Sequence, residues 1–145
     1  MNGFNVDDAV YFLELNTYME SKHMCAKHVR QALERGGLDT TGHPVNAYDY
    51  TKWLPTNGWT ELGVLRSQSA VDEFTKGGLK PGDIAVYKNP TKPMAPGHIC
   101  MWTGHRWLSD FKQRGLNVYR QFPDAIHIYR YNNQIKHLFD YGAVQ

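Results

Sequence analysis

The sequence predicts an α+β fold in which N-terminal helices pack on a C-terminal antiparallel β-sheet. Helical periodicity is confined to the N-terminal part of the chain, where apolar residues recur three and four positions apart. After Leu79 short apolar runs follow one another, separated by turns that contain Pro and Gly. The 145 residues show no repeat and no long linker, so residues 1–145 are expected to form a single domain.

Three helices are expected in the N-terminal half. The first begins at Asp7 or Asp8, either of which can cap it, and carries an apolar stripe. The second begins near Met24 and ends at the glycine pair 36–37, because glycine accepts the left-handed conformation that follows many helices. A shorter third helix is expected over 47–54, ended by the proline that follows it.

The strands are expected in the second half. A turn over 79–83 leads into a short buried strand over 84–87. The segment 98–111, with the sequence HICMWTGHRWLSDF, is predicted to form two strands joined at its central Gly-His pair. A last pair of strands over 125–131 and 135–139 closes the predicted sheet.

Charge and hydropathy exclude several classes of function. The formal charge of +2 comes without a clustered basic run, so nucleic-acid binding is not expected. The N-terminus lacks a basic region and carries three acidic residues by position 14, which is unlike a Sec signal peptide. No apolar run approaches the ~20 residues of a membrane span. We therefore expect a protein made in the cytoplasm, without membrane insertion, that would depend on a dedicated system to act in a periplasm or cell wall.

The stretch SKHMCAKHVRQAL places Cys25 at the start of the second predicted helix. Unpaired amides at a helix N-terminus lower the pKa of a thiol and can bind the oxyanion of a tetrahedral intermediate. This position favours a nucleophile. Two alternatives stay open at this point. Cys25 can be a buried core residue, or it can join His23 and His28 in a zinc site, although their spacing is irregular for zinc.

A cysteine nucleophile needs an imidazole and a polar group that orients it. His98 opens the first strand of the predicted hairpin, where a strand would hold it rigidly. If the turn centres on Gly104, Asp110 faces His98 on the same side of the hairpin and can accept a hydrogen bond from its ring. A one-residue bulge would put Ser109 there instead.

These motifs, in this order, resemble a known family. A Cys at the head of a helix, followed by PGDIAVY, GHICMWTG and WLSDF, resembles the NlpC/P60 and CHAP cysteine peptidases and amidases of peptidoglycan, over roughly residues 18–131. The resemblance implies a papain-like fold with Cys25, His98 and Asp110 as the catalytic residues. The sequence departs from the family where Met24 replaces a small polar residue, and where Asp110 stands for the more usual His, Asn or Gln.

The resemblance implies a peptidoglycan hydrolase that cleaves an amide bond of the stem peptide or of the sugar–peptide link. Such a hydrolase is expected to need no metal or organic cofactor. The substrate would be peptidoglycan or a muropeptide, and a compact chain without an export signal favours an antibacterial type VI secretion effector with a cognate immunity protein. The alternatives are a phage endolysin of the same chemistry, a cysteine protease or deamidase toxin on protein substrates, and a non-catalytic muropeptide-binding module.

Other residues are expected to play smaller parts. Cys100 is expected in the core, and Tyr18 is a weak candidate for an oxyanion donor. The tryptophans can line a groove for a glycan or a peptide, with a structural role expected for at least two of the four.

Overall fold

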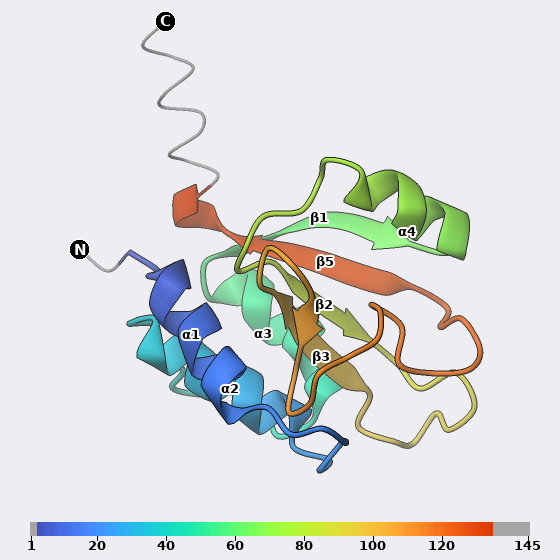
Figure 1. The fold of residues 1–145 in the computed structure, drawn as a ribbon, viewed down its shortest axis with the longest axis horizontal. Helices are drawn as coiled ribbons and strands as arrows, with labels where there is room; N and C mark the ends of the chain where they lie inside the picture. Colours follow the sequence, from blue (N-terminus) through green and yellow to red (C-terminus); the bar gives the residue numbers. More distant parts are fainter. Residues whose placement is uncertain (1–2, 135–145) are drawn as a thin grey trace, which may run out of the picture.

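In a computed structural model, which describes residues 3–134, the predicted α+β architecture is confirmed (Figure 1). The described residues form a five-stranded antiparallel sheet with the strand order β1-β5-β2-β3-β4. The strands are β1 (Trp59–Leu65), β2 (Ile84–Tyr87), β3 (His98–Trp102), β4 (Trp107–Leu108) and β5 (Ile126–Tyr131).

The helices follow the predicted order, with shifted boundaries. They are α1 (Val6–Asn16), α2 (Cys25–Arg35), the 3-10 turn η1 (Ala47–Asp49), α3 (Tyr50–Thr56) and α4 (Gln68–Thr75). The predicted cap of the first helix was wrong, because Asn5 caps α1 by accepting a hydrogen bond from the Asp8 amide at 3.0 Å. The third helix also runs past its predicted end and contains Pro55 in its last turn.

Two elements were not predicted. Strand β1 shows little of the alternation that marks a half-buried strand, since only its two ends are buried. Helix α4 is short and is capped by the Ser67 hydroxyl, which accepts a hydrogen bond from the Ala70 amide at 3.1 Å. The strand β5 lies between β1 and β2, and the predicted partner strand over 135–139 lies outside the described residues.

The sheet separates two hydrophobic cores. Ile84 and Val86 of β2 point toward α1, α2 and α3, whereas Ala85 and Tyr87 point to the other face, which α4 and the segment 115–122 cover. Strand β3 alternates in the same way. Strands β2 and β3 therefore each have one face in each core, which explains why both appear in the sequence as continuous apolar runs.

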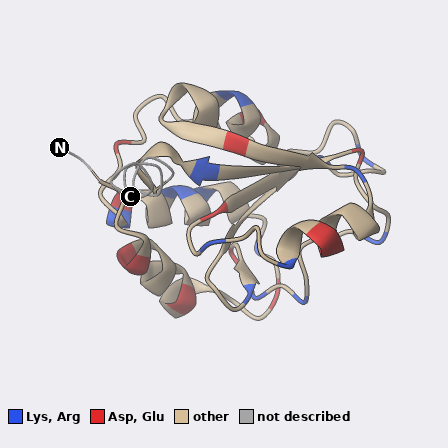
Figure 2. Ribbon diagram, turned by 90° about the horizontal axis from the view of Figure 1, so that it is seen from above, with Lys and Arg blue, Asp and Glu red and all other residues tan. Residues whose placement is uncertain are grey.

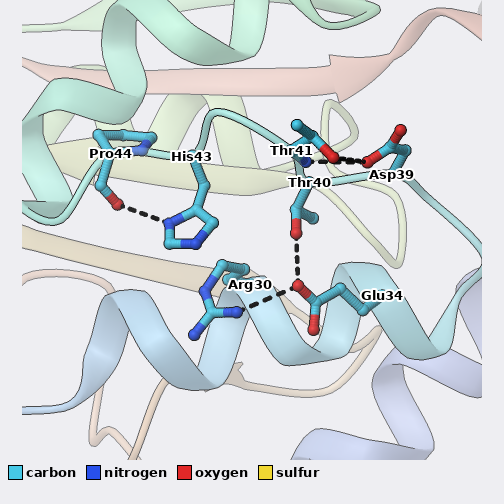
Figure 3. A network of polar contacts seen from close by, with 7 residues as sticks. All are labelled: Arg30, Glu34, Asp39, Thr40, Thr41, His43 and Pro44. Atoms are coloured by element: carbon cyan, nitrogen blue, oxygen red, sulfur yellow. Dashed lines mark hydrogen bonds and ion pairs between the residues drawn. The ribbon is translucent and has the colours of Figure 1, made fainter.

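Glu34 ties the loop that follows α2 back onto the helix (Figure 3). Its carboxylate accepts a hydrogen bond from the hydroxyl of Thr40 and pairs with Arg30 one turn earlier, at 3.1 Å. Asp39 closes the adjoining turn, because its carboxylate accepts two hydrogen bonds from Thr41. The Thr41 amide donates one at 2.9 Å and the Thr41 hydroxyl donates the other at 2.6 Å. These bonds fix the C-terminal half of α2, the helix whose first residue is the candidate nucleophile.

Within residues 3–134 no helix is both long and apolar enough to cross a bilayer. Basic and acidic residues are interspersed along the ribbon in the view of Figure 2, with acidic residues on α1 and α4.

Candidate active site

Cys25 opens α2 and lines a cleft of about 390 Å³. His98 and Asp110 line the same cleft, together with the loop before β3 and the segment around Tyr119. Helix α2 packs against β3, and this contact brings the head of the helix to the first residue of the strand. The structure thus brings together the three residues that the sequence predicted, although their mutual contacts differ from the prediction.

Asp110 holds the segment that leads into α2. Met24 at the N-cap position makes no side-chain hydrogen bond to the helix. Instead Asp110 Oδ2 accepts hydrogen bonds from the amides of Lys22, at 2.6 Å, and Met24, at 3.1 Å. His23 between them has a φ of +58°, and this left-handed residue turns both flanking amides toward one oxygen. The buried carboxylate therefore fixes the segment immediately before Cys25.

His98 is held at the start of β3 by the residue before it. Gly97 has a φ of +85°, and a Cβ there would lie 2.8 Å from the carbonyl oxygen of Tyr87. Only glycine fits this turn without strain. The His98 side chain is buried and its ring packs against that of Tyr87, with centroids 5.5 Å apart. The Gly-His pair of the sequence motif therefore has a steric cause.

Gln113 orients the His98 ring. His98 Nε2 lies 2.7 Å from Gln113 Oε1, and the amide nitrogen of Gln113 donates to the carbonyls of Gly115 and Leu116, at 3.0 and 3.2 Å. Because the two carbonyls can only accept, the amide must present its oxygen to the ring, so Nε2 carries the hydrogen. In the neutral ring Nδ1 is then the basic nitrogen, and among the described residues no hydrogen bond occupies it.

The predicted contact between Asp110 and His98 was wrong, because the hairpin register differs by one residue. The turn spans Thr103 to Arg106, whose N–O hydrogen bond is 3.0 Å, and Trp102 pairs with Trp107. A turn centred on Gly104 would instead have paired Trp102 with Arg106 and His98 with Asp110. Strand β4 also ends at Leu108, after which the chain bends, so neither Asp110 nor Ser109 sits across from His98.

Asp110 nevertheless acts on the site through its charge. Its Oδ1 atom is buried with no hydrogen-bond partner among the described residues, and the residue lines the cleft. The carboxylate raises the pKa of His98, although burial of the imidazole lowers that pKa more and leaves it below its ordinary value. Asp110 is therefore a charged neighbour of the imidazole rather than its hydrogen-bond partner.

Burial disfavours the charged form of both candidate groups, the thiolate of Cys25 and the imidazolium of His98. Burial raises the pKa of the Cys25 thiol to about 11. The backbone amides of Ile99, Ala26 and Cys25 favour the thiolate and so oppose this rise, but burial has the larger effect. The same amides at the head of α2 include those expected to hold an oxyanion. The surroundings of the two side chains therefore favour thiol and imidazole over thiolate and imidazolium.

Several other predicted candidates lie elsewhere. Cys100 is a free, buried residue of the core beneath α4, as expected. Tyr18 does not line the cleft, and its ring packs edge-on against His28. In residues 3–134 no three His, Cys, Asp or Glu side chains gather as a metal site, so His23, Cys25 and His28 do not form the cluster weighed for zinc. The residue that sequence reasoning missed is Gln113, which no motif marks.

Comparisons with known proteins place this geometry in context. No protein-family model and no curated protein matches the chain. Among solved structures, it is similar to a chain of the type VI native effector–immunity complex Tae3–Tai3 from Ralstonia pickettii, at 26% identity and a TM-score of 0.68, over 88% of this chain and 99% of that one. The selenomethionine form of that complex gives 27% identity and a TM-score of 0.65, over 83% and 97% of the two chains. The chain therefore has the α+β papain-like fold and is similar in structure to the type VI effector Tae3, whereas the NlpC/P60 and CHAP families remain a resemblance of motifs.

Proposed function

We propose that this protein is a cysteine amidase that cleaves an amide bond of peptidoglycan, with Cys25 as nucleophile and His98 as proton carrier. The observation that carries the proposal is the hydrogen bond between His98 Nε2 and Gln113, because it leaves Nδ1 basic in the cleft that Cys25 lines. The sequence motifs supply the substrate class. Similarity to a type VI effector supports the biological setting.

The chemistry proceeds from the neutral pair. Cys25 Sγ attacks the carbonyl carbon of the substrate amide while His98 Nδ1 takes the thiol proton. The amides at the head of α2 stabilise the oxyanion. The C–N bond then breaks, and the imidazolium gives its proton to the leaving amine. Water, activated by the neutral imidazole, hydrolyses the thioester and restores the thiol.

Two further side chains position this pair. Gln113 fixes the tautomer and the plane of the His98 ring through one hydrogen bond, and two bonds to backbone carbonyls hold the Gln113 amide itself. Asp110 holds the backbone before Cys25 and favours the imidazolium that forms during attack. Asp110 is thus proposed as a positioning residue with an electrostatic role, and not as the group that hydrogen-bonds the imidazole.

The setting proposed is delivery by a type VI secretion system into a competing bacterium, with a cognate immunity protein in the producer. The support is the likeness to an effector crystallised with its immunity protein. An immunity protein would act most directly by covering the cleft of Cys25 and His98.

Digestion of purified sacculi tests the chemistry. Mass spectrometry of muropeptides released by the wild type is expected to show a new amine and a new carboxylate at one amide bond. Cys25→Ala is expected to release none, and Cys25→Ser serves as a nearly isosteric control. Cleavage that survives Cys25→Ala would contradict the proposal.

Expression in a bacterium, with and without an added export signal, tests the target. We expect lysis only when the wild type is exported, and no lysis with Cys25→Ala. Toxicity confined to the cytoplasmic form would instead indicate a protein substrate, and lysis that survives Cys25→Ala would mean that Cys25 is not the nucleophile. Coexpression of an exported product of a neighbouring gene should suppress the lysis if that product is the immunity protein.

A further inference from the structure

A second cavity, larger than the catalytic cleft, lies on the face of the sheet that α4 covers. Its volume is about 520 Å³, against about 390 Å³ for the cleft of Cys25. Helix α4 forms one wall, and the segment from Gly115 to Arg120 forms another. Volumes of ~300–1,000 Å³ are typical of sites for small molecules. The reaction proposed above uses none of this cavity.

Its floor is aromatic. Trp102 and Trp107 both line the cavity, with ring centroids 5.4 Å apart. Trp107 is only 4% exposed and its ring is tilted by 55° against that of Trp102, which is itself half-buried. A flat, partly exposed indole backed by a second one is a platform for the apolar face of a ring-shaped ligand.

Its rim is polar and carries no excess of either charge. Gln68 and Asp72 of α4 are joined by a hydrogen bond of 2.9 Å, and Asn117 and Arg120 stand on the other wall. Amide, carboxylate and guanidinium groups offer donors and acceptors to hydroxyl groups. One carboxylate and one guanidinium favour a neutral, many-hydroxyl ligand over an anion.

The cavity and the catalytic cleft share a wall residue. Tyr119 lines the cleft of Cys25, this cavity and a third groove of about 310 Å³, and Arg120 lines that groove and the cavity. Trp102 and His98 stand four residues apart on the same face of β3, a separation of about 13 Å along the strand. A ligand in the cavity is therefore within reach of a second group held at the thiol.

We propose that this cavity binds a sugar of the glycan strand, stacked on Trp102, while the attached peptide runs past Tyr119 to Cys25. The proposal rests on the proposed function for its substrate, and it adds a glycan subsite to the site of cleavage. It assigns Trp102 and Gln68 to substrate binding, away from the reacting atoms.

Binding is measured first without any hydrolysis. The probe is chitotriose, a neutral oligomer of N-acetylglucosamine, titrated into the full chain carrying Cys25→Ala while amide chemical shifts are followed. We expect saturable shifts at α4 and around Trp102. Adding Trp102→Ala should weaken binding about tenfold, and Trp102→Phe should retain most of it because a flat ring remains.

Two variants keep the test independent of folding. Gln68→Ala lies on an exposed helix position, is not expected to affect folding, and should weaken binding about fivefold. Tyr11→Ala removes an aromatic ring that is 64% exposed on α1, outside this cavity, and should leave the affinity unchanged. Absence of saturable shifts, or equal loss with Tyr11→Ala, would overturn the subsite.

Hydrolysis separates this inference from the function on which it rests. Trp102→Ala and Gln68→Ala should raise the KM for sacculi relative to wild type, whereas cleavage of a free stem peptide, which carries no sugar, should not change. Equal kinetics of Gln68→Ala and wild type on both substrates, with active enzyme, would overturn the subsite alone. Saccharide binding at Trp102 by a wild type that cleaves neither substrate would support the subsite and contradict the proposed hydrolase.

Discussion

At the scale of single residues, the amide of Gln113 determines which nitrogen of His98 is basic. Its NH2 group is committed to two backbone carbonyls, so its oxygen accepts the Nε2 hydrogen and Nδ1 stays unprotonated in the neutral ring. Without that bond the buried imidazole could rotate or change tautomer. The direction of proton transfer in the proposed reaction therefore depends on a side chain that never contacts the substrate carbonyl.

We expect Gln113→Ala to lower kcat by at least about tenfold, within the ~10²–10⁴ that a general base contributes in total. The reason is a wrongly oriented ring rather than a lost reacting group. The hydrogen bond also raises the pKa of His98, so its removal should move the acid limb of the kcat/KM profile to lower pH. Circular dichroism checks that the variant folds. A drop in kcat with an unmoved acid limb would indicate a purely structural role.

The pH dependence follows from the burial of His98. Burial lowers the pKa of this imidazole from its ordinary 6.5, so the base stays neutral to a more acidic pH. The acid limb of kcat/KM should therefore lie below pH 6.5. Asp110→Asn removes a charge that raises this pKa but keeps an oxygen for the two backbone amides, so the limb should shift further down. An acid limb above pH 6.5 in the wild type would contradict this assignment of the base.

His23 provides a test of the backbone before the nucleophile. Its left-handed φ of +58° suits glycine better than a β-branched residue. His23→Gly should keep the wild-type stability within about 1 kcal/mol, whereas His23→Val should cost about 1–3 kcal/mol and lower activity. Urea denaturation measures both. Equal stability of the two variants would mean that the turn does not hold the two amides on Asp110.

Sequence reasoning singled out Cys25 and His98 because each carries a local signal, a helix start and a Gly-His strand start. It assigned the orienting role to Asp110 because it assumed a turn centred on Gly104, whereas the two-residue turn shifts the hairpin register by one position. It missed Gln113 because the chain bends after β4 and the backbone amide of Gln113 donates to the Trp107 carbonyl at 3.3 Å, a contact that no strand pattern predicts. Register is a property of the folded turn, and the composition of the strands did not specify it.

At the scale of elements, a buried ion pair joins the start of β2 to β5. Asp83 accepts two hydrogen bonds from Arg130, at 2.8 and 2.7 Å, and one from the Lys80 amide at 2.8 Å. The side chains are 0% and 12% exposed. The turn predicted over 79–83 is confirmed. The contact of Asp83 with β5 was not predicted, because the pairing of β5 with β2 is long-range.

Arg130→Met should destabilise the protein by about 3–5 kcal/mol, because it leaves the buried carboxylate of Asp83 without its partner. The matched control is Lys76→Met, which breaks a surface pair with Glu73 whose side chains are 73% and 79% exposed. That change should cost less than about 1 kcal/mol. Chemical denaturation of both variants measures the difference. Equal effects would contradict a buried role for the pair.

The elements that sequence reasoning missed are those with weak periodicity. Only the two ends of β1 are buried, since α4 and the other neighbours cover it partly, so its pattern resembles neither a helix nor a strand. The eight residues of α4 are too few for a clear helical stripe. Elements with two buried faces, such as β2 and β3, were found as continuous apolar runs.

At the scale of the whole molecule, the last described strand lies inside the sheet rather than at its edge. Strand β5 pairs with both β1 and β2, and both cores include its residues. We expect a single cooperative unfolding transition, with far-UV and near-UV signals that coincide in urea. A chain truncated before Ile126 should show no such transition. Two separated transitions in the full chain would mean that the cores unfold independently.

The protonated thiol has a consequence for the chemical durability of the protein. With a pKa of about 11, Cys25 exists almost entirely as the thiol at neutral pH. Oxidants and disulfides react with the thiolate, so the resting protein reacts slowly with both. An oxidising compartment would spare the sulfur until substrate and imidazole draw off its proton together. If Cys25 is the nucleophile, as proposed, the burial that disfavours its ionisation also protects it between turnovers.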